Sequence, residues 1–122
     1  MAVAATYPAP VAERFAGFLA AAGIETVSLT PNDVMTATEA GEMSDDATVR
    51  MIAAGDQPGA QAVLVPDTAL STAHLLPRLA RELGKPVLTA NQVTVWEAAR
   101  LAGLADAGQF LAGDLLLQGS AR

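Results

Sequence analysis

The sequence predicts an α/β fold in which a four-stranded parallel sheet is covered by helices on both faces. Short apolar runs with strand character alternate four times with longer segments of helical periodicity, which is typical of such sheets. The composition, with 52% hydrophobic and 16% charged residues, indicates a well-buried chain. A length of 122 residues is that of one domain, so we expect a single core.

The first strand and helix are predicted at the amino end. Residues 2–6, AVAAT, form a short apolar run that ends before Pro8. Pro10 suits the first turn of a helix, and Gly23 ends that helix. Its predicted inner face consists of Val11, Phe15, Phe18, Leu19 and Ala22.

The second strand is predicted at residues 24–29, IETVSL, where the residues alternate and are rich in β-branched side chains. Residues 30–44 are too polar and too interrupted for a defined element, and long connections of this kind are often lids or binding loops. Ser44 is predicted to cap a helix over residues 45–55, whose first turn is acidic.

The third strand is predicted at residues 61–66, QAVLVP, and the helix after it is expected to start at Ser71 or Thr72 and to end at Gly84. Pro77 then falls inside this helix, so we expect a slight distortion there. The predicted inner face consists of Leu76, Leu79, Ala80 and Leu83.

The fourth strand is predicted at residues 86–90, and a last full helix follows it. Thr94 and Glu97 match a capping box, although Asn91 could cap this helix one turn earlier. The tail is expected to add a short helix near residues 106–118.

Four strands that are each followed by a helix imply a flavodoxin-like or Rossmann-like lobe with three layers, α/β/α, over residues 1–122. In such sheets, ligands bind beyond the carboxyl ends of the strands, where the strand order reverses. The candidate site residues by this rule are Thr6, Tyr7, residues 30–44, residues 67–70 and residues 89–92.

Charge and residue usage argue against several functions. The formal net charge of -6 disfavours nucleic acid or an anionic membrane as a partner. Without cysteine, the chain has no disulfide, no thiolate metal cluster and no thiol nucleophile. We expect neither a metal nor a cofactor. The stretch MAVAATYPAP lacks the basic start of a signal peptide, and no apolar run is long enough to span a bilayer, so we expect a cytoplasmic protein.

Three segments resemble one family: ATYPAPVAERFAGFLAAAGIETVSL, DQPGAQAVLVPDTALST and, most specifically, LGKPVLTANQVTVWEAARLAG. They are similar to the C-terminal half of the aspartate/glutamate racemase superfamily, in the branch of maleate cis-trans isomerase, arylmalonate decarboxylase and the ectoine-utilisation protein EutA. The resemblance covers almost the whole chain. Members of this branch have two such lobes, which face each other across the active site.

The resemblance implies particular site residues. Asp67 stands where the family has its second catalytic cysteine, Tyr7 matches an active-site tyrosine, and Asn91 lies in the counterpart of the SNQ loop. Where the family has a substrate-binding asparagine, this chain offers Thr36 or Ala37. The implied catalytic residues are therefore Asp67 and Tyr7, and the implied substrate contacts are Thr6, Thr68, Ala69, Thr36 and Asn91.

The family's thiolate exchanges a proton next to a carboxylate or attacks an activated double bond. A carboxylate in its place suits proton exchange where burial or a neighbouring acid raises its pKa, but it is a poor nucleophile toward an alkene carbon. It also repels an anionic substrate, by about 4 kcal/mol at about 4 Å and an effective dielectric of about 20. The resemblance thus implies cofactor-independent isomerase, racemase or decarboxylase chemistry without the thiol mechanism.

Simple structural roles compete with these functional ones. Asp67 lies between a strand and a helix, where it could cap the helix at a gain of about 1 kcal/mol. Tyr7 could pack its ring beside Pro8, and Asn91 could be an ordinary loop or cap residue. His74, the only histidine, is expected on a solvated side of its helix.

Three further expectations are structural. Asp45 and Asp46 are expected to supply negative charge at a helix start and not to bind a metal. Trp96 and Met51 are expected in the core.

Two functions of different class follow from these observations. The first is an enzyme lobe that acts on a small carboxylate, with Asp67 as the acid and base. Because a lone lobe cannot enclose a ligand, this function requires a second lobe, from a homo-oligomer or from a partner chain. The second is a non-catalytic lobe that binds a small molecule or a protein, or a truncated or split half of a two-lobe enzyme.

Overall fold

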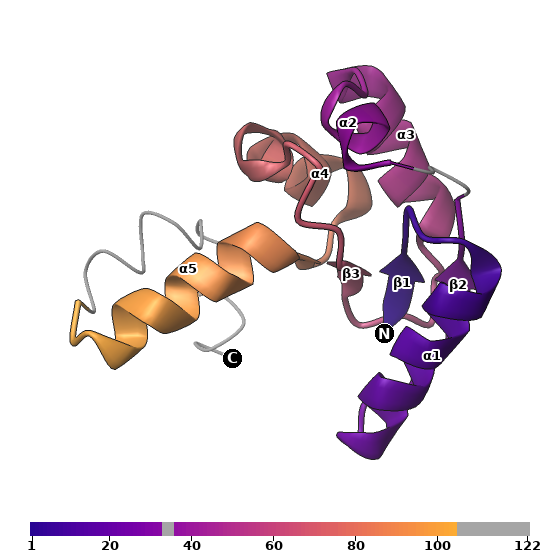
Figure 1. Cartoon of the computed structure of the whole chain (residues 1–122), viewed down its shortest axis with the longest axis horizontal. Coiled ribbons are helices and arrows are strands. Elements are labelled where there is room, and N and C mark those ends of the chain that lie inside the picture. Colours follow the sequence, from indigo (N-terminus) through magenta and orange to yellow (C-terminus); the bar gives the residue numbers. More distant parts are fainter. Residues whose placement is uncertain (33–35, 105–122) are drawn as a thin grey trace.

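The chain is built around a four-stranded parallel sheet (Figure 1). The computed structural model describes residues 1–32 and 36–104. The strands are β1 (Ala2–Ala4), β2 (Ser28–Thr30), β3 (Val63–Val65) and β4 (Val87–Thr89), and their order in the sheet is β2-β1-β3-β4. This confirms the predicted α/β fold, whereas the expected tail helix near residues 106–118 lies outside the described residues.

Helices cover both faces of the sheet. The helices of the described residues are α1 (Ala9–Ala21), α2 (Ala37–Gly41), α3 (Asp45–Gly55), the 3₁₀ turn η1 (Ala73–Leu75), α4 (Leu76–Leu83) and α5 (Ala90–Leu101), of which α5 projects from the sheet. Successive strand residues point to opposite faces, so Ala2 and Ala4 pack in one cluster with α3 and α4, whereas Val3 packs in a second cluster with α1.

The strand order reverses between β1 and β3. The chain leaves β1, pairs β2 on one side of it, and crosses back to place β3 on the other side, so that Ala2 aligns with both Ser28 and Val63. The carboxyl ends of β1 and β3 therefore flank the position where a sheet of this kind most often holds its ligand.

The second strand begins later than predicted because backbone N–H groups at its predicted start donate to carbonyls at the end of α1. Gly23 has a φ of +78°, its N–H donates to the carbonyl of Ala20, and the N–H of Ile24 donates to the carbonyl of Leu19 at 2.9 Å. This is a Schellman motif, which ends a helix by satisfying its last carbonyls. Since Ile24 donates to the helix, the strand starts at Ser28.

The predicted inner face of α1 is only partly correct. Leu19 is buried and Phe15 packs against the cluster beneath the helix, but Phe18 is 68% exposed, and Val11 and Ala22 also face solvent. Ala12 takes the inner position instead.

The connection over residues 30–44, predicted to be a loop, contains α2. Thr36 caps this short helix: its hydroxyl accepts from the N–H of Glu39 at 3.1 Å, and the Glu39 carboxylate accepts from the N–H of Thr36 at 3.0 Å. This reciprocal pair is a capping box. Ala40 anchors α2 in the larger core cluster.

The helix after β3 starts later than Ser71 or Thr72. The turn η1 precedes α4, which begins at Leu76 and so places Pro77 in its first turn, where a missing N–H costs nothing. The inner face is confirmed for Leu76 and Leu79, which are buried, and for Leu83, which packs against the cluster.

The capping box of α5 also differs from the prediction. Thr89 and Gln92 form it, with both reciprocal hydrogen bonds present. Thr94 lies inside the helix and donates to the carbonyl of Ala90, so the predicted box of Thr94 and Glu97 and the cap at Asn91 are both wrong.

Charges at the start of α3 connect that helix to η1 and α4. Asp46 pairs with Arg78 at 2.7 Å, and Asp45 lies 2.8 Å from His74, whose side chain is 53% exposed. The expectations of helix-start charge and of a solvated His74 are confirmed. Within residues 1–32 and 36–104, no helix has the length and apolarity that crossing a membrane requires.

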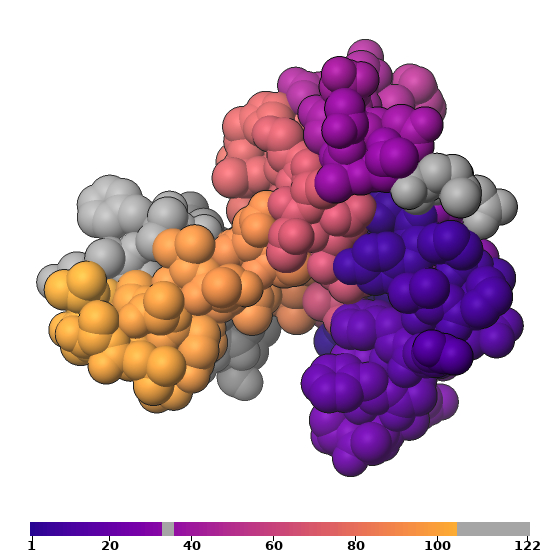
Figure 2. Space-filling model, viewed as in Figure 1, coloured from indigo at the N-terminus to yellow at the C-terminus, as the bar shows by residue number. Residues whose placement is uncertain are grey.

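Helix α5 leaves the sheet as an arm. Figure 1 shows it running away from β3 and the other helices, and Figure 2 shows it standing clear of α1. Met51 packs against the core as expected, whereas Trp96, on α5, is partly exposed and belongs to neither buried cluster of the described residues.

Candidate functional site

Two side chains meet where the strand order reverses. Thr6 follows β1 and Asp67 follows β3, and the Thr6 hydroxyl donates a hydrogen bond to Oδ2 of Asp67. Thr6 is 1% exposed, whereas Asp67 is half-buried, so the carboxylate lies between the interior and the solvent. Residues far apart in the chain thus meet at the edge of the sheet that the carboxyl ends of the strands form, which is where the topology predicts a ligand site.

The second oxygen of this carboxylate is also bound. Oδ1 of Asp67 accepts from the N–H of Ala69 at 2.8 Å, which closes a turn of the chain on itself. The alternative that Asp67 caps the following helix is therefore wrong, because Thr72 and Leu75 occupy the cap positions of η1 and α4. Asp67 instead fixes the loop between β3 and η1, residues 66–72, which we call the site loop.

Tyr7 lies beside this pair. Its ring packs against the core cluster under α1, and its hydroxyl donates to the carbonyl of Pro66 at 3.1 Å. Burial of the ring and, to a lesser extent, the negative charge of Asp67 raise the pKa of the Tyr7 hydroxyl above its ordinary value. Tyr7 is therefore a neutral hydrogen-bonding group at physiological pH.

Asn91 connects the site loop to α5. Its side-chain Nδ2 donates to the carbonyl of Thr68 at 2.8 Å, and both residues are exposed at the surface. This contact joins the chain that follows β4 to the chain that follows β3. Thr68 and Asn91 consequently form the solvent-facing side of the same edge.

The predicted contact residue Thr36 lies at the start of α2, which borders the site loop. A β-carbon added to Gly41, at the other end of α2, would lie 3.5 Å from the carbonyl oxygen of Ala69. Ala40 of α2 and Leu70 of the loop share one buried cluster. The Thr36 hydroxyl already caps α2, and contact of Thr36 with a ligand stays a prediction.

The structure thus brings together Thr6, Tyr7, Asp67, Ala69 and Asn91 and leaves Thr36 at the neighbouring helix. Neither α2 nor the carbonyl of Pro66 was predicted from the sequence. The spacing of Thr36 and Glu39, a threonine followed three residues later by a glutamate, is a local signal that would have found α2.

The chemistry available at this edge is hydrogen bonding and proton exchange. It offers the carboxylate of Asp67, the hydroxyls of Thr6, Tyr7 and Thr68, the side-chain amide of Asn91 and backbone polar groups. No group of three potential metal ligands occurs in the part of the chain that the structure describes.

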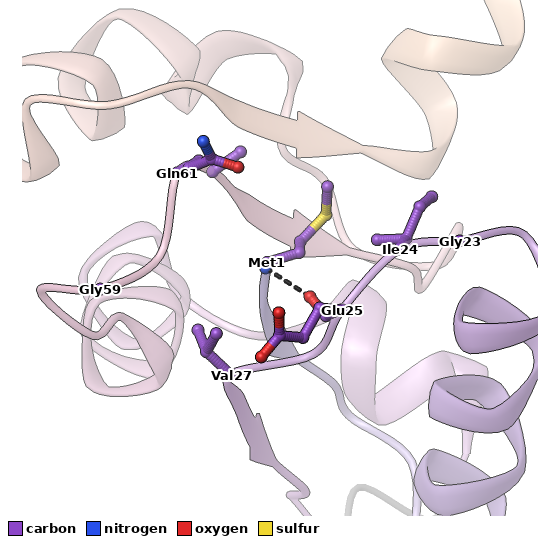
Figure 3. A pocket seen from close by; sticks show the side chains of 8 residues that line it. Met1, Gly23, Ile24, Glu25, Val27, Gly59 and Gln61 are labelled. Carbon is purple, nitrogen blue, oxygen red and sulfur yellow. Dashed lines mark hydrogen bonds between the residues drawn. The ribbon is translucent and has the colours of Figure 1, made fainter.

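A cavity of about 620 Å³ lies at the opposite edge of the sheet, which the amino ends of the strands form (Figure 3). Its lining comes from residues that precede the strands, including Met1, Val27 and Gln61. The amino group of Met1 donates to the carbonyl of Glu25 at 2.6 Å across it. Because parallel sheets bind ligands at the carboxyl ends of their strands, we place the candidate site at Asp67 and not in this cavity.

Comparisons with known proteins agree with the fold. The family model described as arylmalonate decarboxylase matches residues 1–115. The arylmalonate decarboxylase of Bordetella bronchiseptica is 31% identical over 108 residues, which are 84% of this chain and 44% of that protein.

Solved structures give the same result. A crystal structure of arylmalonate decarboxylase has a TM-score of 0.77 at 25% identity, covering 85% of this chain and 46% of that one. A liganded double mutant of that enzyme, with one glycine changed to cysteine and one cysteine to serine, has a TM-score of 0.80 at 25% identity, covering 85% and 45%. The chain therefore spans less than half the length of these relatives.

Proposed function

Because the chain belongs to the arylmalonate decarboxylase family, we propose that it is one lobe of a two-lobed site for a small carboxylate, in which Asp67 exchanges the proton. The observation that carries the proposal is the position of Asp67, half-buried beyond the carboxyl end of β3 and held by Thr6, which follows the neighbouring strand β1. The proposal is also supported by the resemblance of the sequence, from which we infer that relatives carry a catalytic cysteine where this chain has Asp67.

The geometry suits Asp67 to proton exchange. A carboxylate offers about four acceptor directions, and two of them are used by the Thr6 hydroxyl and the Ala69 N–H. The remaining directions are available to a substrate, and the two internal bonds fix where the carboxylate points. Since the chain has no cysteine, covalent addition of a thiolate is not open to it.

Tyr7 is proposed to orient the substrate. Its hydroxyl donates to Pro66, which leaves the oxygen as an acceptor, and its raised pKa keeps it neutral beside Asp67. A neutral phenol next to a carboxylate adds a hydrogen-bonding group without adding charge.

The site requires a second lobe. The chain spans 44% to 46% of the length of its relatives, and Thr68 and Asn91 face solvent at the edge. We propose that a second copy of the chain, or a partner chain, covers this edge. Groups of that lobe would also hold the substrate carboxylate away from Asp67, since two carboxylates at about 4 Å repel by about 4 kcal/mol at an effective dielectric of about 20.

The test is turnover of three substrates that represent the family's reaction types: phenylmalonate for decarboxylation, maleate for isomerisation and aspartate for racemisation. The assembled protein should turn over one of them, and Asp67→Asn should lower that rate by about 100-fold or more, as expected for loss of a general acid or base. Circular dichroism checks that the variant is folded. Equal rates for the two proteins would rule out the role of Asp67.

Asp67→Cys is the complementary variant. If the rest of the edge is suited to the family's reaction, a thiolate at this position should raise decarboxylase or isomerase turnover above that of Asp67→Asn. No gain in any of the three reactions would mean that the other groups of the site are not arranged for this chemistry.

One observation favours a second candidate, a lobe that binds without catalysis. Both oxygens of Asp67 already accept hydrogen bonds from the chain, which is a structural role for the carboxylate. Under this alternative, none of the three substrates is turned over, and Asp67→Asn lowers only the stability. Turnover by the wild-type protein therefore separates the two functions.

A further inference from the structure

We infer that the Thr6 hydroxyl and the Ala69 N–H form a binding pair for a carboxylate, and that the chain fills this pair with its own Asp67 side chain. The Asp67 carboxylate thereby acts as an internal ligand. It therefore determines which chemical groups of a ligand can bind at this edge of the sheet. The inference concerns binding and does not depend on catalysis by Asp67.

The two donors are directed at the two oxygens of one carboxylate. Thr6 donates to Oδ2 and Ala69 to Oδ1, so each oxygen is bound from a different segment of the chain. Thr6 is buried just beyond the end of β1, a central strand of the sheet, and this burial fixes its hydroxyl. Donors held in place in this way bind a carboxylate without first being reorganised.

The Ala69 N–H is held in position by contacts that do not involve Asp67. Before Asp67, the carbonyl of Pro66 accepts from the Tyr7 hydroxyl, and after it, the carbonyl of Thr68 accepts from Asn91. Leu70 is 1% exposed and lies in the larger core cluster. The loop therefore has three anchors that remain when the Asp67 side chain is removed.

Removal of that side chain leaves the buried Thr6 hydroxyl without its acceptor, in a space that a carboxylate has just vacated. A buried donor without a partner is unfavourable, so a small carboxylate from solution gains by replacing the lost one. Formate and acetate match the vacated space of Asp67→Ala and Asp67→Gly respectively, because alanine retains the β-carbon and glycine does not.

The same contacts restrict the ligands of the intact protein. A free carboxylate cannot reach these two donors while Asp67 occupies them. On the proposed function, a carboxylate substrate must then direct its carboxylate to the second lobe and present only its neutral carbon atoms to Asp67. Asp67 is thus a specificity-determining residue of this edge.

The experiment measures thermal unfolding of the full chain in formate, acetate and chloride at equal ionic strength. Formate should raise the unfolding midpoint of Asp67→Ala, and acetate that of Asp67→Gly, each beyond the effect of chloride. At a concentration ten times Kd, the ratio of folded to unfolded protein should rise about 11-fold. Wild-type protein and Asp67→Asn should respond to neither anion more than to chloride.

The control is the double variant Thr6→Val/Asp67→Ala, which has the same vacated space without the hydroxyl donor and should lose the response to formate. An equal response in the wild type or in the double variant overturns the inference, as does the lack of any response in both single variants. If Asp67→Ala does not fold in chloride, refolding yield replaces the midpoint. A higher yield in formate than in chloride supports the inference, and equal yields overturn it. None of these readouts is turnover, so failure here leaves the proposed function standing.

Discussion

At the scale of single residues, Tyr7 reports on Asp67 because it is the only tyrosine in the chain. Burial of the ring and then the charge of Asp67 raise its pKa. We predict that the tyrosinate absorbance band appears with a midpoint above the ordinary value of about 10. In Asp67→Asn the midpoint should fall, but not to the ordinary value, because burial is the larger cause and remains.

Spectrophotometric titration of the two proteins is the measurement, and the unfolded chain in urea supplies the reference midpoint. If Asp67→Asn titrates at the same pH as the wild type, the carboxylate does not act on the phenol and the two groups do not share a site.

The raised pKa of Tyr7 also has a consequence for stability. A group whose pKa is higher in the folded state contributes stability that is fully present below its unfolded pKa and lost as pH rises through its folded pKa. Tyr7 should therefore make the fold less stable above about pH 10. Urea unfolding at neutral and alkaline pH should show a smaller alkaline loss for Tyr7→Phe than for the wild type. Identical losses would show that other groups cause the alkaline destabilisation.

At the scale of elements, the packing of α3 on β1 depends on a glycine. A β-carbon on Gly55 would lie 2.9 Å from the β-carbon of Ala4 and 3.3 Å from its Cα, closer than side chains approach. Gly55→Ala should therefore destabilise the fold by about 1 to 3 kcal/mol, as overpacking does.

The matched control for Gly55→Ala is Gly17→Ala. Gly17 lies inside α1 with nothing within 4 Å of an added β-carbon, and alanine there should stabilise the helix by about 0.5 to 1 kcal/mol. Chemical unfolding of both variants gives the comparison. Equal effects of the two substitutions would mean that α3 does not contact β1 as closely as described.

The start of α5 provides a second test at this scale. Thr89 is 1% exposed and forms the capping box with Gln92, whereas Thr94 lies one turn later on the exposed side. Thr89→Ala should cost about 1 kcal/mol of stability, and Thr94→Ala should change it by no more than about 0.5 kcal/mol. If Thr94→Ala were the more destabilising of the two, Thr94 would be the helix cap, as the sequence alone predicts.

Local signals explain which elements could be predicted. Ser44 caps α3, and this helix matches its prediction because its cap is fixed by neighbouring residues. Ile24 was assigned to a strand on its β-branched character, but the helix end before it uses its N–H. The start of α4 at Leu76 depends on the core contacts of Leu75 and Leu76, which a local pattern does not contain.

The candidate site was predictable in position but not in geometry. Strand ends and strand order suffice to bring Thr6 and Asp67 together, although they are 61 residues apart. The bond of Asp67 to Ala69 and that of Asn91 to Thr68 depend on the course of the loop after β3. Loop conformation follows from contacts between distant segments, so the sequence could not show that the Asp67 carboxylate is already bound on both oxygens.

At the scale of the whole molecule, the open edge and the projecting helix α5 lead to a prediction about assembly. Apolar side chains on α5 and just after it face solvent: Leu101 is 72% exposed, Val95 43% and Leu104, which follows the helix, 56%. Isolated exposed apolar residues are common, but Val95 and Leu101 lie on one helix that stands clear of α1 (Figure 2), and Leu104 closely follows its end. We expect a second copy to pack there and light scattering to give about twice the chain mass of 12.4 kDa.

Leu101→Glu should shift this mass toward that of one chain, because a charge is costly to bury in an apolar contact. Val27→Glu is the matched control, since Val27 is 45% exposed but lines the cavity at the opposite edge of the sheet, and it should leave the mass unchanged. A mass of one chain at every concentration would contradict self-assembly. The second lobe of the proposed site would then have to come from a different chain, and turnover should appear only when that chain is added.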